Sequence, residues 1–240
     1  MESGDVRIEL VVFDVAGTTV RDDDAVHDCL RAALGDAGVR VTRADVNSVM
    51  GISKPVAIHK LLERHAASRR WTTTHVHEIH AAFLHRMIAH YEHSSNVQPM
   101  PNAEATLSKL RAAGVRVALD TGFSRVILDT ILRRLGWKDA GLLDTTVASD
   151  EVARGRPYPD LIVKAMELTG VTNSGAVAKV GDTPADLEEG AAARCGLIVG
   201  VTNGSHTIDE LKAHPHTHLI SHLGLLPKVV LGHGGMVSAR

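Results

Sequence analysis

The chain has few cysteines and no long hydrophobic run. Cys29 and Cys195, its only two cysteines, lie far apart and form no CxxC motif, which is typical of free thiols in a reducing compartment. No apolar run reaches the roughly 18 residues that a membrane-spanning helix requires, and the N-terminus lacks the basic-then-apolar pattern of a signal peptide. We therefore expect a cytoplasmic protein.

Positive charge is not in excess either. The 26 Lys and Arg residues stand against 28 Asp and Glu residues, the formal net charge is −2, and no basic block occurs. This argues against nucleic acid or a membrane surface as the main partner. The 15 histidines show neither the HExxH nor the paired Cys/His spacing of a zinc site. His214, His216 and His218 alternate in what we expect to be a solvated loop and strand edge.

The hydrophobic pattern changes along the chain. The apolar run Leu10–Phe13 predicts a buried strand, whereas residues 22–98 have helical spacing. From Pro101 onward helical segments alternate with short apolar ones, which predicts strands at 115–120, 146–148, 176–180, 197–201 and 217–220. Strands separated by helices form a parallel sheet covered on both faces, so we expect an α/β core with the helical insert as a lid over the strand ends. Residues 232–240 are predicted to fray.

The insert carries its own helix signals. Asp24, Thr42 and Ser53 are candidates for N-cap residues, and Pro55 after Ser53 is tolerated in a first helical turn. A longer helix is predicted from about Thr74. Its apolar residues recur at near-fourfold spacing, which is typical of a buried stripe: Ile79, Phe83, Met87 and Tyr91.

Asp14 directly follows the first predicted strand and opens a turn of small residues. In an open α/β sheet, ligands bind at the carboxyl ends of the central strands. Asp14 is therefore a candidate for chemistry, and the alternative is that it only caps a turn.

Polar groups follow later strands as well. Thr121 and Gly122 offer a hydroxyl and an amide that suit a phosphoryl oxygen. Arg156 could neutralise a phosphoryl group or orient a carboxylate, or else form a surface salt bridge. Asp182 and Asp186 lie four residues apart in a strand-to-helix turn, which favours Mg²⁺, although such a pair could also cap the helix.

The order of these motifs resembles the haloacid dehalogenase superfamily of phosphotransfer hydrolases over essentially the whole chain. Segments 14–19, 155–159, 165–168 and 179–183 are similar to the phosphonoacetaldehyde hydrolase (phosphonatase) family and its phosphonatase-like relatives. The resemblance implies a Rossmann-like, three-layer core at 1–21 and 99–240 and a helical C1-type cap at 22–98. It also implies a small phosphorylated or phosphonate metabolite as the substrate, and a homodimer that an apolar cap helix could form.

The resemblance assigns roles residue by residue. Asp14 would attack phosphorus and form an aspartyl-phosphate. Mg²⁺ would bind the Asp14 carboxylate, the Ala16 backbone carbonyl and Asp182, with support from Asp186. The phosphoryl oxygens would be held by the turn after the nucleophile, by the second strand end and by the basic residue: Ala16, Gly17, Thr18, Thr121, Gly122 and Arg156.

Ala16 bears on the class of substrate. Most phosphatases of the superfamily carry a second aspartate here, and an acid in this place protonates a leaving alkoxide, which alanine cannot do. In a phosphonate the leaving group is carbon, which needs an electron sink, and a lysine imine on an adjacent aldehyde provides one.

Lys54, four residues after Met50, resembles the Schiff-base lysine of the family. The field of the helix N-terminus and a nearby Mg²⁺ would lower its pKa. The alternative is an exposed lysine at a helix start.

The chain departs from phosphonatase at two positions. Ala57 stands where the family has a histidine three residues past the lysine, and Val15 replaces a tryptophan after the nucleophile.

Three functions stay open. The favoured one is hydrolysis of a phosphonate such as phosphonoacetaldehyde. The second is hydrolysis of a small phosphate ester, as in phosphoglycolate phosphatases. The third is binding of a phosphoryl ligand with little catalysis.

Overall fold

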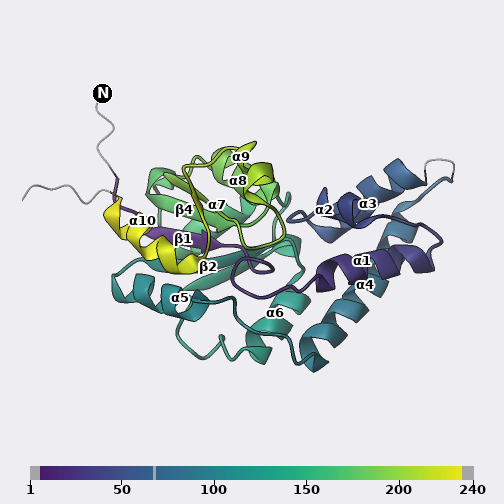
Figure 1. Ribbon diagram of the computed structural model, residues 1–240, viewed down its shortest axis with the longest axis horizontal. Helices are drawn as coiled ribbons and strands as arrows, with labels where there is room; N and C mark the ends of the chain where they lie inside the picture. Colours follow the sequence, from purple (N-terminus) through teal and green to yellow (C-terminus); the bar gives the residue numbers. More distant parts are fainter. Residues whose placement is uncertain (1–5, 67–68, 234–240) are drawn as a thin grey trace, which may run out of the picture.

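A six-stranded parallel sheet forms the centre of the computed structural model, which describes residues 6–66 and 69–233 (Figure 1). Its strands are β1 (Leu10–Phe13), β2 (Arg116–Thr121), β3 (Thr145–Ala148), β4 (Val177–Gly181), β5 (Leu197–Val201) and β6 (His218–Ile220). They lie in the order β3-β2-β1-β4-β5-β6, and each pairs in parallel with its neighbours. This is the Rossmann order, in which a crevice opens at the carboxyl ends of β1 and β4, where the connections change direction.

Helices cover both faces of the sheet. One face carries α5 (Ala103–Ala112), α6 (Arg125–Arg134) and α10 (Leu226–Gly232), and the other carries α7 (Asp160–Thr169), α8 (Pro184–Ala192) and α9 (Ile208–Lys212) (Figure 1). Short 3-10 helices occur at Ser149–Glu151, Ser174–Ala176 and Leu223–Leu225. Because side chains alternate along a strand, Leu10 and Val12 pack in the cluster around α7, whereas Val11 and Phe13 pack on the opposite face. The predicted three-layer α/β core is confirmed.

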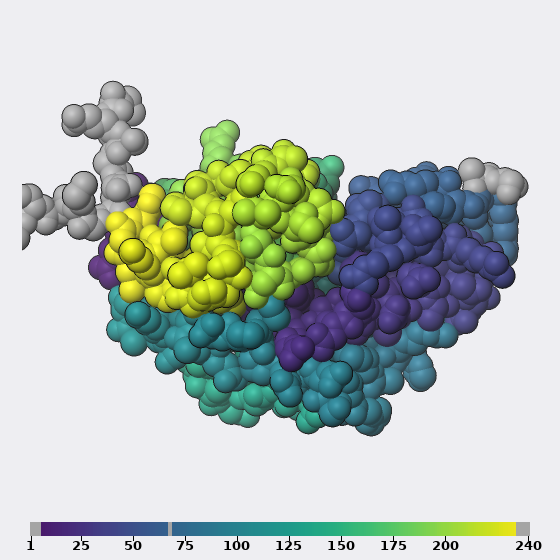
Figure 2. All heavy atoms as spheres, viewed as in Figure 1, coloured from purple at the N-terminus to yellow at the C-terminus, as the bar shows by residue number. Residues whose placement is uncertain are grey.

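The helical insert between β1 and α5 packs against one end of the core (Figure 2). It consists of α1 (Ala25–Asp36), α2 (Arg43–Asn47), α3 (Lys54–His65) and α4 (Thr73–His93). The two chain passages that join it to the core are paired by backbone hydrogen bonds. Arg21 N–H donates to Gln98 O at 3.0 Å, and Met100 N–H donates to Thr19 O at 2.8 Å. Among the described residues, the helices include none that is both long enough and apolar enough to cross a bilayer.

Two of the three N-cap candidates do not cap their helices. Ser53 occupies the N-cap position of α3, but its side chain makes no capping hydrogen bond. Asp24 occupies the N-cap position of α1 but does not cap it, because its left-handed backbone (φ 65°) turns its side chain toward Arg43. Asp22 Oδ1 instead accepts the N–H of Val26 at 3.1 Å. Thr42 caps α2 as predicted, with a complete capping box.

The helix α10 was not predicted. Its residues Leu226, Pro227 and Val230 are buried on the α5 side of the sheet, which stabilises a helix too short to show a clear period. Residues 232–240 were expected to fray. Gly232 is instead the last residue of α10, and residues 234–240 lie outside the described part of the chain.

The predicted apolar stripe of α4 is confirmed as the core of the insert, since Ile79, Phe83, Met87 and Tyr91 are all buried. We expect Phe83→Ala to lower the free energy of unfolding by about 3–5 kcal/mol, because a large cavity would remain in a packed core. His85→Ala, on the exposed side of the same helix, is the matched control and should change stability little. Denaturant titration of both variants measures this; equal stabilities would contradict the packing described.

Candidate active site

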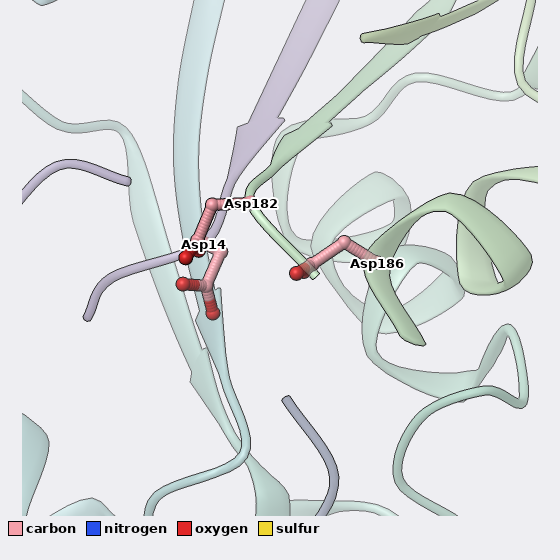
Figure 3. A group of neighbouring side chains, drawn as sticks. All are labelled: Asp14, Asp182 and Asp186. Carbon is pink, nitrogen blue, oxygen red and sulfur yellow. The ribbon is translucent and has the colours of Figure 1, made fainter. Parts of the chain in front are cut away.

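Three aspartates meet at the carboxyl ends of β1 and β4 (Figure 3). Asp14 follows β1, Asp182 follows β4, and Asp186 reaches toward both from the first turn of α8. The strand register puts Phe13 beside Val180, and Asp14 N–H donates to Val180 O at 2.9 Å. Carboxylate oxygens of the three residues lie within 4.8 Å of one another, and all three side chains are buried.

Neighbouring donors hold two of these carboxylates in place. Asp182 Oδ1 accepts the Thr18 hydroxyl at 2.9 Å, and its Oδ2 accepts the backbone N–H and hydroxyl of Ser205 at 2.7 and 2.6 Å. Asp186 Oδ2 accepts the Thr183 hydroxyl at 2.6 Å within the capping box of α8. Gly17, at φ 90°, lies so close to Asp182 that a Cβ there would collide with the carboxylate. Helix capping and metal binding are thus compatible for Asp186, because Oδ1 remains directed away from the cap.

Arg156 lies in the buried centre of the site rather than in a surface salt bridge. Its Nη1 donates to Asp14 Oδ1 at 2.6 Å and to the carbonyl of Gly51 at 3.2 Å. Its Nε donates to Glu189 at 2.9 Å, and Nη2 donates to the carboxylate and the backbone carbonyl of Asp120. Of the roles considered for Arg156, the orientation of carboxylates is the one that this geometry displays.

Sequence reasoning missed three members of this network: Lys179, Glu189 and Asp120. Lys179 Nζ donates to Glu189 at 2.9 Å, lies 3.2 Å from Asp186 Oδ1, and also contacts Asp120. The available signal was a lysine within the otherwise apolar strand Val177–Gly181, since a buried lysine requires acidic partners. Glu189 lies one helical turn after Asp186, on the same face of α8.

Buried acidic groups outnumber buried basic groups at the site. Five buried carboxyl groups (Asp14, Asp120, Asp182, Asp186 and Glu189) accompany three basic side chains, Lys54, Arg156 and Lys179. Burial raises the pKa of Asp14 to about 8 against the opposing effect of Arg156, and burial together with Asp186 raises the pKa of Asp182. A buried cluster of oxygen ligands with surplus negative charge fits a hard divalent cation such as Mg²⁺. The donor set of Asp14, Asp182 and Asp186 therefore suits this metal.

Lys54 is buried, with 4% of its surface exposed, so it is not an exposed lysine at a helix start. Its ammonium lies 5.3 Å from the centre of the Phe123 ring, and its hydrogen bond to Ile52 O is long, at 3.4 Å. Burial lowers the pKa of Lys54 to about 8, against the attraction of Asp22 and Asp14. The main cause of the lowered pKa is thus the removal of water from the amine on burial.

A small cavity, of about 20 Å³, lies between the lid and the core and is lined by residues of both. Its lining includes most of the predicted catalytic and phosphate-binding residues: Asp14, Ala16, Lys54, Thr121, Gly122 and Arg156. Gly17 and Thr18 do not line it but pack on Asp182. Gly122 permits the close approach, because a Cβ there would lie 2.6 Å from the carbonyl oxygen of Gly51. His59 is exposed and pairs with Glu63, away from this cavity.

Residues 8–194 match the family model of haloacid dehalogenase-like hydrolases. The phosphonoacetaldehyde hydrolase of Lysinibacillus sphaericus is 29% identical over 221 residues, which cover 87% of this chain and 81% of that protein. The phosphonoacetaldehyde hydrolase of Bacillus cereus (strain AH187) is 31% identical over 216 residues, covering 81% of this chain and 77% of the relative.

Solved structures support the same fold. A phosphonoacetaldehyde hydrolase-like protein from Oleispira antarctica has a TM-score of 0.83 at 22% identity, over 97% of this chain and 94% of that one. A predicted phosphoglycolate phosphatase from Haemophilus somnus has a TM-score of 0.78 at 19% identity, over 92% and 97%. At these identities the likeness concerns the fold alone. Taken with the family model and the sequence relatives, the chain belongs to the haloacid dehalogenase-like hydrolases and is a phosphonatase-like enzyme.

Proposed function

We propose that this chain is a Mg²⁺-dependent hydrolase that cleaves the carbon–phosphorus bond of phosphonoacetaldehyde or a related phosphonate aldehyde. One observation carries the proposal: the buried amine of Lys54 and the carboxylate of Asp14 line the same cavity, in which Ala16 offers no acid for a leaving alkoxide. An amine of lowered pKa suits imine formation with an aldehyde. Hydrolysis of a phosphate ester requires no such amine.

We further propose that residues 22–98 form the cap and that residues 1–21 and 99–240 form the core. The paired passages at Thr19–Arg21 and Gln98–Met100 support these boundaries, because they are where the chain enters and leaves the helical insert.

The chemistry then begins at Lys54. Its neutral amine condenses with the substrate aldehyde and releases water, which leaves an iminium group one carbon away from the carbon bonded to phosphorus. Arg156 holds Asp14 Oδ1 at 2.6 Å, so the other oxygen of Asp14 is the one that attacks phosphorus. As the new P–O bond forms, the C–P bond breaks and its electron pair moves into the iminium to form an enamine.

The transferred group is now an aspartyl-phosphate on Asp14, and water hydrolyses it to phosphate. The enamine takes up a proton on carbon, and its hydrolysis releases the aldehyde product and the free amine of Lys54. Thr121 and Gly122 border the cavity where the phosphoryl oxygens would lie. When bound by Asp14, the Ala16 carbonyl, Asp182 and Asp186, Mg²⁺ would supply positive charge to these oxygens.

Asp14→Asn tests the nucleophile. The amide has nearly the same shape as the carboxylate but is a poor nucleophile, so phosphate release should be abolished for whatever substrate the enzyme accepts. Asp209→Asn, in the exposed helix α9, is the matched control and should retain activity. An undiminished rate in Asp14→Asn would refute covalent transfer to this residue.

Lys54→Arg tests the imine. Arginine keeps the positive charge but forms no Schiff base, so we expect loss of phosphate release from phosphonoacetaldehyde and loss of borohydride trapping at position 54. Lys60→Arg, on the exposed side of α3, should behave like the wild type. Full turnover of the phosphonate by Lys54→Arg would exclude the imine role. Wild-type activity confined to phosphate esters would favour a phosphatase, and ligand binding without phosphate release would favour a binding protein.

Metal removal tests the cofactor. A chelator should abolish turnover and added Mg²⁺ should restore it. Ser205→Ala removes the hydroxyl that orients Asp182, so we expect Mg²⁺ affinity to fall by roughly 10- to 100-fold, measured by titration calorimetry. Ser95→Ala, at an exposed position, is the control. Unchanged activity after complete chelation would contradict a Mg²⁺-dependent reaction.

A further inference from the structure

The ammonium of Lys54 is buried beside an aromatic ring rather than beside a carboxylate. Its nitrogen lies over the Phe123 ring, 5.3 Å from the ring centre, which is within the range of a cation–π interaction. Its hydrogen bond to Ile52 O is long, at 3.4 Å, and among residues 6–66 and 69–233 it forms no ion pair. The face of Phe123 is thus placed where a buried cation usually has an anion.

The Phe123 ring is held in position by both the core and the insert. Phe123 lies in the turn after β2, and its N–H donates to the Thr121 hydroxyl at 3.1 Å. Its carbonyl oxygen accepts the N–H and the hydroxyl of Ser149 at 2.9 and 3.0 Å. From α4, Tyr91 packs edge-on against the ring at 6.1 Å between ring centres, and Phe83 packs at 6.5 Å. The ring is therefore already in place when charge develops near it.

The same ring borders the reacting groups, because Phe123 lines the cavity that Lys54 and Asp14 also line. Under the proposed function this cavity accepts a phosphonate, which is an anion, and the site already holds more carboxyl groups than basic side chains. A further carboxylate beside Lys54 would repel the substrate. The quadrupole of a neutral ring attracts a cation without adding negative charge.

We propose that the face of Phe123 stabilises the cationic nitrogen of Lys54, first as the ammonium of the free enzyme and then as the iminium of the reaction, of which the second part rests on the proposed function. Condensation of the neutral amine with the aldehyde takes up one proton, releases water and leaves the positive charge on the iminium. When the C–P bond breaks, its electron pair neutralises this charge and forms the enamine. A ring attracts the iminium less strongly than a carboxylate would, so it opposes this neutralisation less.

Fluorination of the Phe123 ring tests this role with little change of shape. Monofluoro-, difluoro- and trifluorophenylalanine at this position withdraw electrons from the ring face in steps, so the attraction to a cation weakens in the same steps. In the full-length protein with ¹³C-labelled lysine, the ε-carbon signal that is lost in Lys54→Arg reports the protonation of this amine. The trifluorinated ring should lower the ratio of ammonium to neutral amine at fixed pH by roughly 3- to 10-fold, with intermediate values for the other two rings.

Reductive trapping of acetaldehyde on Lys54 by cyanoborohydride tests the iminium, at a pH where the amine is neutral in every variant. The acetaldehyde concentration that half-saturates trapping measures the stability of the iminium, and the trifluorinated ring should raise it by roughly 3- to 10-fold. The matched control is the same series at Phe83, a buried ring of the same cluster, which should change neither the Lys54 titration nor trapping. Thermal melting checks that each variant is folded.

The two readouts separate this role from the proposed function. A Lys54 titration that does not follow fluorination of Phe123, or that follows fluorination of Phe83 equally, would overturn the role of the ring. A stepwise change in the titration supports the contact with the ammonium even if wild-type Lys54 forms no adduct with an aldehyde. That absence of an adduct would refute the proposed function and, with it, the iminium part of the proposal.

Discussion

Two buried cations, Arg156 and Lys179, hold together the carboxylates that meet at the carboxyl ends of the central strands. Several acidic groups in a water-excluded space would repel one another and could not all remain ionised. The guanidinium of Arg156 offers several donors in one plane, and here it contacts Asp14, Asp120 and Glu189 together. Arg156 therefore orients the Asp14 carboxylate while it joins β1, β2 and α8.

The same guanidinium connects the core to the lid, because Nη1 also donates to the carbonyl of Gly51. This segment packs on Gly122, where the backbones of insert and core approach so closely that a Cβ would lie 2.6 Å from the carbonyl oxygen of Gly51. Lys54 follows three residues after Gly51 and is thereby enclosed above Asp14. Enclosure removes water from the amine, and this desolvation, more than any nearby charge, lowers its pKa.

Much of this arrangement was predictable. The strands, the lid helices and the positions of Asp14, Thr121, Asp182 and Asp186 at strand ends follow from apolar periodicity and from the rule that parallel strands present their carboxyl ends at one edge. Other features were not. The cap of α1 was assigned to Asp24 because residue type alone does not reveal a left-handed backbone. Arg156 had three interpretations (neutralising a phosphoryl group, orienting a carboxylate or forming a surface salt bridge) and Lys179 had none, since neither has its acidic partners nearby in sequence.

The hydrophobic pattern along the chain was enough to predict the fold class and to bring the candidate polar residues to one edge of the sheet, because that pattern specifies each strand and the connections bring the strand ends together. The burial of Lys54 and the choice of Arg156 partners were decided only in three dimensions. Both features depend on how the helical insert packs against the core. That packing is made by contacts between residues far apart in the chain, which no local sequence pattern specifies.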